Sequence, residues 1–406
     1  MKYYNYLKYL LSILLFSCEL NNVNEIDIQT PIEKVYWEPI PNQYIVTLGQ
    51  SFINFKLDGD YISRQKLFRT KTKEYFEKYG LREESILHVY ESAIYGFTFN
   101  GDINMMEQIK SDPLVQNVEQ DFEIKLLPIL RPILDPLIGG NNPNPSPQPA
   151  QSIPYGIIRV NGGVSYNGGK SVFVVDTGIQ LNHPDLNVDS SKGFNAFSTG
   201  SNGASLNDGN GHGTHVAGTI GALDNEIGVI GVAPGVKVVP VKVLGSNGSG
   251  TNSGVIAGVN YIASVGQNGD VANLSLGGGV SIALDNAVLN ASNKGIWFVL
   301  AAGNSSTNSS SSSPGRVNGP FILTVSAMDR NDRFASFSNF GNPPIDWCAP
   351  GVSINSTWIN STYRSISGTS MAAPHVAGLL VLGEIESDGF VIGDPDNNPD
   401  PIASRR

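Results

Sequence analysis

The pattern of apolar and polar positions changes character at about residue 150 of the chain. Beyond this point short, continuous apolar runs alternate with longer runs of small and aliphatic residues, which predicts buried parallel strands joined by helices. The fold class predicted for this region is therefore α/β, a mostly parallel sheet with helices on both faces. The expected strands are Ser171–Val175, Val236–Val243, Val271–Leu276, Ile296–Leu300 and Ile322–Val325, and the expected helices are His212–Leu223, Asn252–Val265, Ser281–Asn293 and Ser370–Ile385.

Residues 42–127 predict a separate, small α+β domain. Its expected strands are 43–48, 92–99 and 115–121, and its expected helices are 64–79 and 103–110. Residues 128–149 are rich in Pro and Asn and predict an extended, exposed linker, where we expect proteolytic maturation. Residues 150–386 form the second domain. Residues 387–406 are acidic and interrupted by prolines, which predicts either a disordered tail or a truncated end.

The ends and the charge of the chain indicate an exported protein. Lys2 and Lys8 flank an apolar run over residues 10–16, so residues 1–17 are typical of a signal peptide. The run ends at Cys18, in a pattern that resembles a bacterial lipoprotein box, so the protein is expected to be a cell-envelope lipoprotein or simply extracellular. The 45 glycines among 406 residues are typical of a compact, turn-rich secreted protein. The formal net charge of −10 argues against nucleic acid as a partner.

Three separated motifs carry the candidate chemistry. The strand at 171–175 runs into Asp176, His212 lies between two glycines at a helix start, and Ser370 follows a Gly-Thr turn that opens an apolar helix. A serine hydroxyl needs a base within hydrogen-bond reach, and a histidine that a carboxylate orients can take and return its proton. Taken alone, the Gly-Thr-Ser stretch is an ordinary helix cap. Because active sites of such sheets lie at the carboxyl ends of the strands, we expect the three side chains to meet there.

With these motifs in the order Asp, His, Ser, the region from Ala150 to Gly383 resembles the catalytic domain of subtilisin-family serine endopeptidases. Residues 42–127 resemble the inhibitory pro-domain that precedes such domains; the alternative is a two-helix sandwich of unknown role. The resemblance implies a zymogen that hydrolyses peptide bonds in protein substrates, acts as a monomer and is blocked by its own pro-domain. The alternative from another class is a catalytically silent, envelope-anchored module that binds peptides.

Further residues are expected at the cleft. Asn304 follows a strand and a glycine turn, and its amide is expected to stabilise the oxyanion together with the backbone N–H of Ser370. Two glycine-rich segments resemble those with which the family clamps an extended peptide as an added strand, and the serine-rich loop 305–313 is expected to form part of the first specificity pocket. The clamping segments are Ser275, Leu276, Gly277 and Gly278, and Gly248, Ser249 and Gly250.

The resemblance also implies one structural Ca²⁺. Its expected ligands are the side chains of Gln151, Asp185 and Asn225 and the carbonyls of Leu223, Ile227 and Val229. Carboxylate, amide and carbonyl oxygens suit this cation.

The other histidines and the second cysteine are expected to have structural roles. His215 and His375 lie in small-residue helices and are expected either to pack there or to support the catalytic residues, and His183 is expected in a surface loop. Cys348 is expected to be a buried small apolar residue, and no disulfide is predicted.

Overall fold

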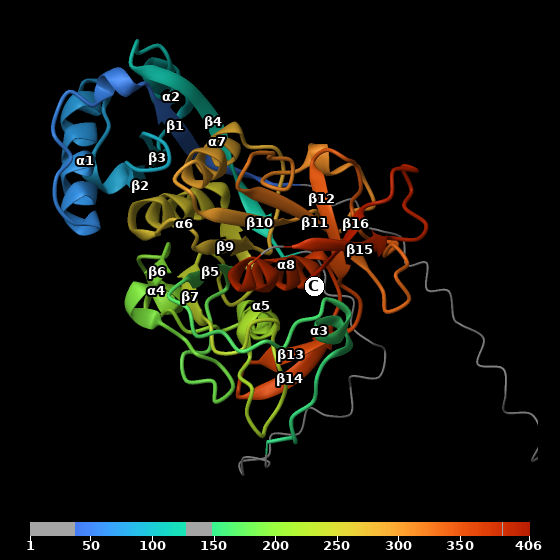
Figure 1. Ribbon diagram of the computed structural model, residues 1–406. Coiled ribbons are helices and arrows are strands. Elements are labelled where there is room, and N and C mark those ends of the chain that lie inside the picture. The colour runs from blue at the N-terminus through green and yellow to red at the C-terminus, as the bar shows by residue number, and fades with distance from the viewer. Residues whose placement is uncertain (1–36, 127–147, 384) are drawn as a thin grey trace, which may run out of the picture. The chain divides into compact units, whose positions relative to one another are not determined.

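The computed structural model describes residues 37–126, 148–383 and 385–406. In this part of the chain a nine-stranded sheet has the order β15-β16-β12-β11-β10-β9-β5-β7-β6 (Figure 1). Its pairings are parallel except that between β15 and β16, so the predicted mostly parallel sheet is confirmed. The strands are β5 (Ser171–Asp176), β6 (Phe194–Asn195), β7 (Lys237–Lys242), β9 (Val271–Leu274), β10 (Trp297–Ala301), β11 (Ile322–Met328), β12 (Ile345–Pro350), β15 (Glu386–Phe390) and β16 (Pro401–Ser404).

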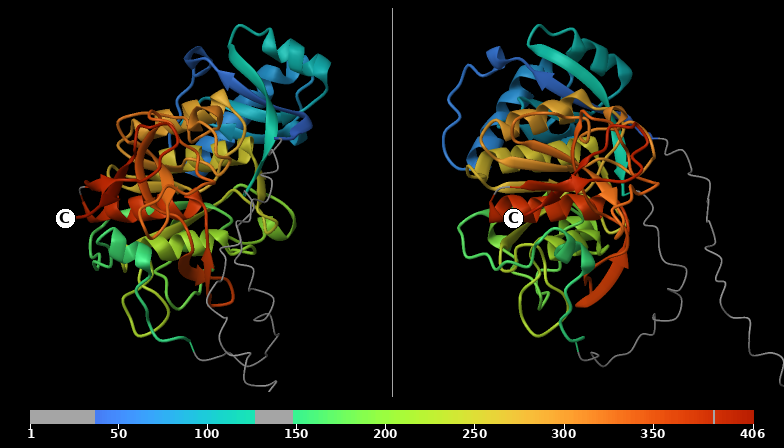
Figure 2. Two further views of the ribbon diagram at one scale, coloured as in Figure 1. Left: turned by 90° about the vertical axis from the view of Figure 1, so that its right-hand side faces the viewer. Right: turned by 45° about the vertical axis from the view of Figure 1, so that its right-hand side comes forward.

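Helices cover both faces of this sheet. One face packs against α5 (His212–Gly221) and α8 (Thr369–Leu382), and the other against α6 (Asn252–Val265) and α7 (Ile282–Ser292) (Figures 1 and 2). In β5, Val174 packs with the hydrophobic core on the α5 and α8 face, and Val175 packs with the core on the α6 and α7 face. This explains why the strand is apolar at every position instead of alternating.

Shorter elements complete this domain. They are α3 (Tyr155–Arg159), α4 (Gly200–Gly203), the short strand β8 (Ser249–Thr251), and the hairpin of β13 (Ile354–Trp358) and β14 (Thr362–Ile366), which packs on α5.

The N-terminal domain is a four-stranded antiparallel sheet with two helices on one face. Its strands are β1 (Pro39–Leu48), β2 (Ile86–Tyr90), β3 (Gly96–Asn100) and β4 (Val115–Lys125), and its helices are α1 (Tyr61–Phe76) and α2 (Ile103–Lys110). The core is aromatic and includes Phe68, Phe76, Phe97 and Phe99. The end of β4 extends beyond this core and pairs with β8, so the sheet order is β2-β3-β1-β4-β8.

The strand predicted over residues 92–99 is only half right. Residues 91–95 are a loop, β3 begins at Gly96, and β2 precedes the loop as a strand that the sequence pattern did not reveal. The reason is a tertiary contact, because the backbone N–H groups of Glu91, Ser92 and Ala93 all donate to the side-chain oxygen of Asn260, at 3.0, 2.7 and 3.0 Å. Asn260 belongs to α6, far away in the sequence.

The tail is ordered, which corrects the expectation of a disordered tail. Residues 386–390 and 401–404 form β15 and β16 at the edge of the main sheet, with Cys348 of β12 in register with Ile402. Although residues 387–406 are mostly polar and acidic, they include three buried apolar residues, Val391, Ile402 and Ala403. Burial of these side chains contributes free energy that favours the edge strand.

The predicted helix over residues 370–385 is shorter in the structure. It ends at Leu382, because Gly383 has a φ of 138°, outside the helical range. Among the described residues no helix combines the length and the apolar character that a membrane span needs. The predicted signal peptide, Cys18 and residues 128–147 of the predicted linker lie outside the described residues.

Candidate active site

The predicted residues lie at the carboxyl ends of neighbouring parallel strands. Asp176 is the last residue of β5, Ser275 comes directly after β9, and Asn304 follows β10 by three residues. Since β10, β9 and β5 are adjacent in the sheet, these ends share one edge. Two helices start here as well, α5 at His212 and α8 at Thr369.

Asp176 and His212 form a buried pair. The Nδ1–H of His212 donates to both carboxylate oxygens at 2.9 Å, and the two residues are 0% and 3% exposed. The backbone N–H of Thr177 donates to the same carboxylate at 2.7 Å, and the Thr177 hydroxyl accepts from the N–H of Gly213 at 2.9 Å. The strand end and the helix start are therefore joined by the backbone as well as by the two side chains.

Glycines permit this close approach. Gly211 precedes α5 with a φ of 113°, a conformation that side chains disfavour. A Cβ at Gly213 would collide with the carbonyl oxygen of Gly178, and a Cβ at Gly218 with the hydroxyl of Thr357 in β13. The small residues of α5 thus bring its backbone against β5 on one side and the hairpin on the other.

Ser370 occupies the first turn of α8, after the non-helical Gly368. Its Oγ donates to the backbone carbonyl of Ser275 at 3.1 Å. Among the hydrogen bonds of the described residues, none links this hydroxyl to His212, so the structure joins His212 to Asp176 and not to Ser370. Without substrate, catalytic hydrogen bonds are often long or poorly aligned, and they tighten when substrate is bound.

A proline inside α8 leaves the carbonyl of Ser370 available for a hydrogen bond from outside the helix. Pro374 has no N–H, so the carbonyl of Ser370 four residues earlier receives no helical hydrogen bond. That carbonyl instead accepts from the Ser275 hydroxyl at 2.8 Å, which in turn accepts from the Asn273 amide at 2.8 Å. The helix start is thereby anchored to the end of β9.

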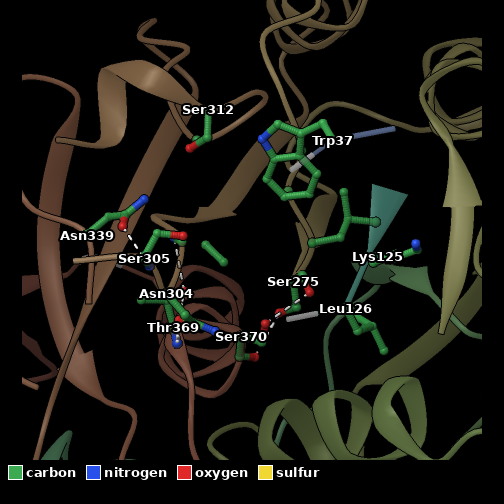
Figure 3. A pocket seen from close by; sticks show the side chains of 16 residues that line it. Trp37, Lys125, Leu126, Ser275, Asn304, Ser305, Ser312, Asn339, Thr369 and Ser370 are labelled. Carbon is green, nitrogen blue, oxygen red and sulfur yellow. Dashed lines mark hydrogen bonds between the residues drawn. The ribbon is translucent and has the colours of Figure 1, made fainter. Parts of the chain in front are cut away.

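Asn304 is held with an amide nitrogen that makes no hydrogen bond to the described residues. Its Oδ1 accepts from both the N–H and the hydroxyl of Thr369, each at 2.8 Å. This fixes the orientation of the amide and leaves Nδ2 to donate elsewhere. Figure 3 shows Asn304, Thr369 and Ser370 together at one side of a pocket, with Ser275 beside them.

That pocket is small, with a cavity of about 30 Å³. Ser305 and Ser312 of the serine-rich loop line it, together with Gly277 and Gly278 of the predicted clamping segment. Trp37, Lys125 and Leu126 also line it, as Figure 3 shows.

The end of β4 lies along the other predicted clamping segment as an added strand. Lys125, Ile124 and Glu123 pair with Ser249, Gly250 and Thr251, and the N–H of Leu126 donates to the Gly248 carbonyl at 2.9 Å. The Ile124 side chain is fully buried and packs with the core on the α6 and α7 face.

Two carboxylates of β4 meet the first turns of two helices. Glu119 accepts from the Ser281 hydroxyl and, at 3.3 Å, from the N–H of Ala283 in α7. Asp121 accepts from the N–H of Ser253 in α6 at 3.2 Å. Burial raises the pKa of both carboxyls, while the helix N-termini favour their charged forms.

The six residues predicted to hold Ca²⁺ lie close together. The Asp185 carboxylate accepts from the Asn225 amide at 2.9 Å and from the N–H of Val229 at 3.1 Å, and the Gln151 amide donates to the Leu223 carbonyl at 3.0 Å. The Asn225 side chain also accepts from the N–H of Ile227 at 2.8 Å.

The chemistry of this cluster fits a cation. Asp185 is fully buried, burial raises its pKa to about 6, and no Lys, Arg or His forms an ion pair with it within the described part of the chain. A buried carboxylate without a positive partner is costly, and a hard cation among oxygen ligands would neutralise it.

The remaining histidines have structural roles. His215 donates through Nε2 to the Ile354 carbonyl at 2.9 Å and His375 through Nδ1 to that of Met371 at 2.8 Å, and burial lowers their pKa values to about 3 and 4. The expected packing roles are thus confirmed. The expected surface position of His183 is wrong, since it is 3% exposed and its ring meets the edge of Tyr363.

Two supporting residues of the site were not predicted. Lys242, opposite Asp176 in the β5–β7 register, is 1% exposed and donates to the carbonyls of Thr177 and Leu244. The signal for it was a lysine that directly follows the apolar run Val238–Val241. Thr369 positions Asn304 and was visible only as part of the Gly-Thr-Ser motif.

Comparisons with known proteins agree with this geometry. The subtilase family model matches residues 167–384, and the peptidase inhibitor I9 model matches residues 43–127. The chain is 39% identical over 307 residues to a subtilisin-like serine protease, AsES, of Sarocladium strictum, which covers 72% of this chain and 71% of that protein. It is 46% identical over 239 residues to subtilisin Savinase of Lederbergia lenta, covering 57% of this chain and 84% of that one.

A solved structure gives the same result. The crystal structure of a cold adapted subtilisin-like serine proteinase matches with a TM-score of 0.50 and 43% identity, over 56% of this chain and 83% of that chain. The family model alone spans more than half of the 406 residues. With an inhibitor I9 pro-domain followed by a subtilase domain, this chain belongs to the subtilisin family of serine proteases.

Proposed function

We propose that Ser370, His212 and Asp176 are the catalytic triad of this serine protease and that Asn304 donates to the oxyanion. The observation that carries the proposal is the buried Asp176–His212 pair, at the sheet edge where Ser370 and Asn304 line one pocket. Asp176 holds the His212 ring with Nδ1 protonated, which leaves Nε2 free to accept a proton.

The reaction then follows from these positions. The Ser370 oxygen attacks the carbonyl carbon of the scissile peptide bond while its proton passes to Nε2 of His212. The carbonyl oxygen becomes an oxyanion and accepts from Nδ2 of Asn304 and the N–H of Ser370. The tetrahedral intermediate expels the amine, which takes the proton from His212 and leaves an acyl-serine. Water repeats the sequence and releases the acid.

Substrate binding is proposed to free the nucleophile. In the structure the Ser370 hydroxyl donates to the Ser275 carbonyl. A rotation about χ1 that breaks this single hydrogen bond turns the proton toward His212. The carbonyl of Ser370 keeps its bond from the Ser275 hydroxyl, so α8 itself need not move.

We propose that substrates bind as β4 does. An extended peptide would pair with Gly248–Gly250 on one side and lie along Ser275–Gly278 on the other, with an apolar side chain at the position of Ile124. Main-chain pairing tolerates many sequences. Because the pro-domain strand occupies this cleft, the precursor is a zymogen that its own β4 inhibits.

The proposal includes export. Residues 1–17 would be removed as a signal peptide and the precursor released as a monomer outside the cell or anchored in the envelope through lipid on Cys18.

It also includes Ca²⁺ at the cluster of Gln151, Asp185, Leu223, Asn225, Ile227 and Val229. The ion would supply positive charge there, while the residues themselves join the segment at 150–152 to the loop 223–229 through the hydrogen bonds described above.

A labelled fluorophosphonate tests the chemistry. It should modify the matured protein at Ser370, as mass spectrometry of the labelled peptide would show, and Ser370→Ala should not react. Ser310→Ala removes an exposed serine of the serine-rich loop and should label like the wild type. A matured protein that binds peptides without labelling would instead be a silent binding module. The masses of wild type and Ser370→Ala would also show where the linker is cut and whether the cut depends on Ser370.

A further inference from the structure

The loop between β15 and β16 carries side-chain oxygens at every second position. Asp394, Asp396, Asn398 and Asp400 alternate with Pro, Asn and Pro. Calcium loops supply ligands with this two-residue spacing, from positions 1, 3, 5 and 7. The loop differs from an EF-hand because it has Pro399 at the sixth position, where that motif has glycine. The spacing alone does not make a site.

A buried oxygen without a donor is the second observation. The Asp400 side chain is 0% exposed, and its Oδ2 accepts from the hydroxyl of Ser326 in β11. Its Oδ1 has no hydrogen-bond partner in the described structure. Half of a buried carboxylate is therefore unsatisfied, and this costs free energy unless something positive approaches it.

The surrounding groups make the local charge more negative. The nearby carboxylates of Asp394 and Asp396 add to the effect of burial, and together they raise the pKa of Asp400 to about 7. Within the described residues no Lys, Arg or His forms an ion pair with any of these three residues. Buried carboxylates that stay charged are paired with a positive group or coordinate a metal ion.

Neutral oxygens complete the surroundings. The Asn342 amide nitrogen donates to the carbonyl of Asn398 at 3.2 Å, and its Oδ1 is buried without a partner among the described residues. Asn342 also lowers the pKa of Asp400, so its side chain lies near the same carboxyl. The loop, this turn and β11 thus converge on Asp400.

We propose that this loop is a second Ca²⁺ site, with Asp394, Asp396 and Asp400 as carboxylate ligands and Asn342 and Asn398 as neutral oxygen ligands. Three carboxylates and two neutral oxygens suit calcium, which accepts six to eight oxygens in flexible geometry, better than Mg²⁺, which requires a near-ideal octahedron. In the described part of the chain, no three acidic, His or Cys side chains already surround a common point. Binding therefore draws in the half-exposed Asp396.

Such an ion would fasten the last strand of the sheet. β16 is joined to β12 through one registered pair, Cys348 with Ile402. An ion held by Asp400, by the loop and by the Asn342 turn would tie this strand to its neighbours. None of these residues belongs to the cluster around Asp185, so the two sites can be tested separately.

The test counts ions in the full chain carrying Ser370→Ala, which lacks the proposed nucleophile. The decalcified protein is titrated with Ca²⁺ alone by calorimetry. The double variant Asp396→Asn/Asp400→Asn should bind one ion fewer, and Asp185→Asn should lose a different one. Asp388→Asn, which removes an exposed carboxylate of β15, is the matched control and should keep the full count. An undiminished count in the double variant overturns the proposal, whatever Asp185→Asn does.

A second measurement does not depend on how the variants fold. Hydrogen exchange of the peptide covering residues 391–404 should slow by about 100-fold when Ca²⁺ is present at about 100 times its Kd. The Asp185→Asn protein should show the same slowing. Exchange that is unchanged by Ca²⁺ in this peptide contradicts the proposal.

Discussion

Ile124 offers a direct measure of how tightly the pro-domain holds the cleft. Its side chain is fully buried, and it packs with the core of the catalytic domain, not with the aromatic core of its own domain. Ile124→Ala removes three carbon groups at about 0.8 kcal/mol each, or about 2.4 kcal/mol. This corresponds to about a 60-fold rise in the inhibition constant, and the cavity that the change leaves adds to it.

The assay adds the pro-domain, residues 37–127, to the matured protease and measures the inhibition constant with a chromogenic peptide. Ile103→Ala is the control, because Ile103 starts α2 and is 55% exposed. It should leave the constant within about threefold of the wild type, as surface substitutions usually do. An Ile124→Ala pro-domain that inhibits within about fivefold of the wild type would refute the reasoning, as would equal losses for both variants.

Three further predictions concern the site, the interface and the metal. Asn304→Leu should lower kcat with little change in KM, by about 10²–10³, a magnitude taken from the oxyanion asparagine of subtilisin itself; an unchanged kcat would exclude Asn304 as a donor. Because burial raises the pKa of Glu119 and Asp121 in the complex, the complex binds more protons than its separated parts. The inhibition constant should therefore fall as the pH is lowered toward the ordinary pKa of a carboxyl group and rise as the pH is raised. The double variant Glu119→Gln/Asp121→Asn should flatten this dependence. Inhibition constants measured across pH test both expectations. Removing Ca²⁺ with a chelator should lower the melting temperature measured by calorimetry, and Asp185→Asn should lower it without chelator; no shift in either case would contradict a structural ion.

The candidate chemistry was visible in the sequence because each part of it is local. The strand before Asp176, the glycines around His212 and the turn before Ser370 lie within a few residues of the side chains that they position. Short-range patterns of this kind survive in any fold that uses them. The same is true of α6, whose bounds agree with the prediction because Thr251 caps it at one end and Gly266 follows it at the other.

What the sequence did not reveal depends on partners distant in the chain. The loop at 91–95 is set by one amide of α6, and β16 forms because β12 offers an edge. The hydroxyl of Ser370 donates to the carbonyl of Ser275, which is 95 residues away in the chain. The periodicity of the sequence carries no information about such contacts, because strand formation depends on which neighbours the fold brings alongside.

The contacts of α5 limit how this protease can be made more stable. Replacing a helical glycine by alanine is a common way to raise a melting temperature, worth up to about 1 kcal/mol where space allows. Gly213 and Gly218 do not allow it. A methyl group at Gly213 would collide with the carbonyl oxygen of Gly178, just after β5, and one at Gly218 would collide with the Thr357 hydroxyl. Such a change would push the helix outward and take the imidazole with it, so thermostabilising libraries should leave this helix untouched.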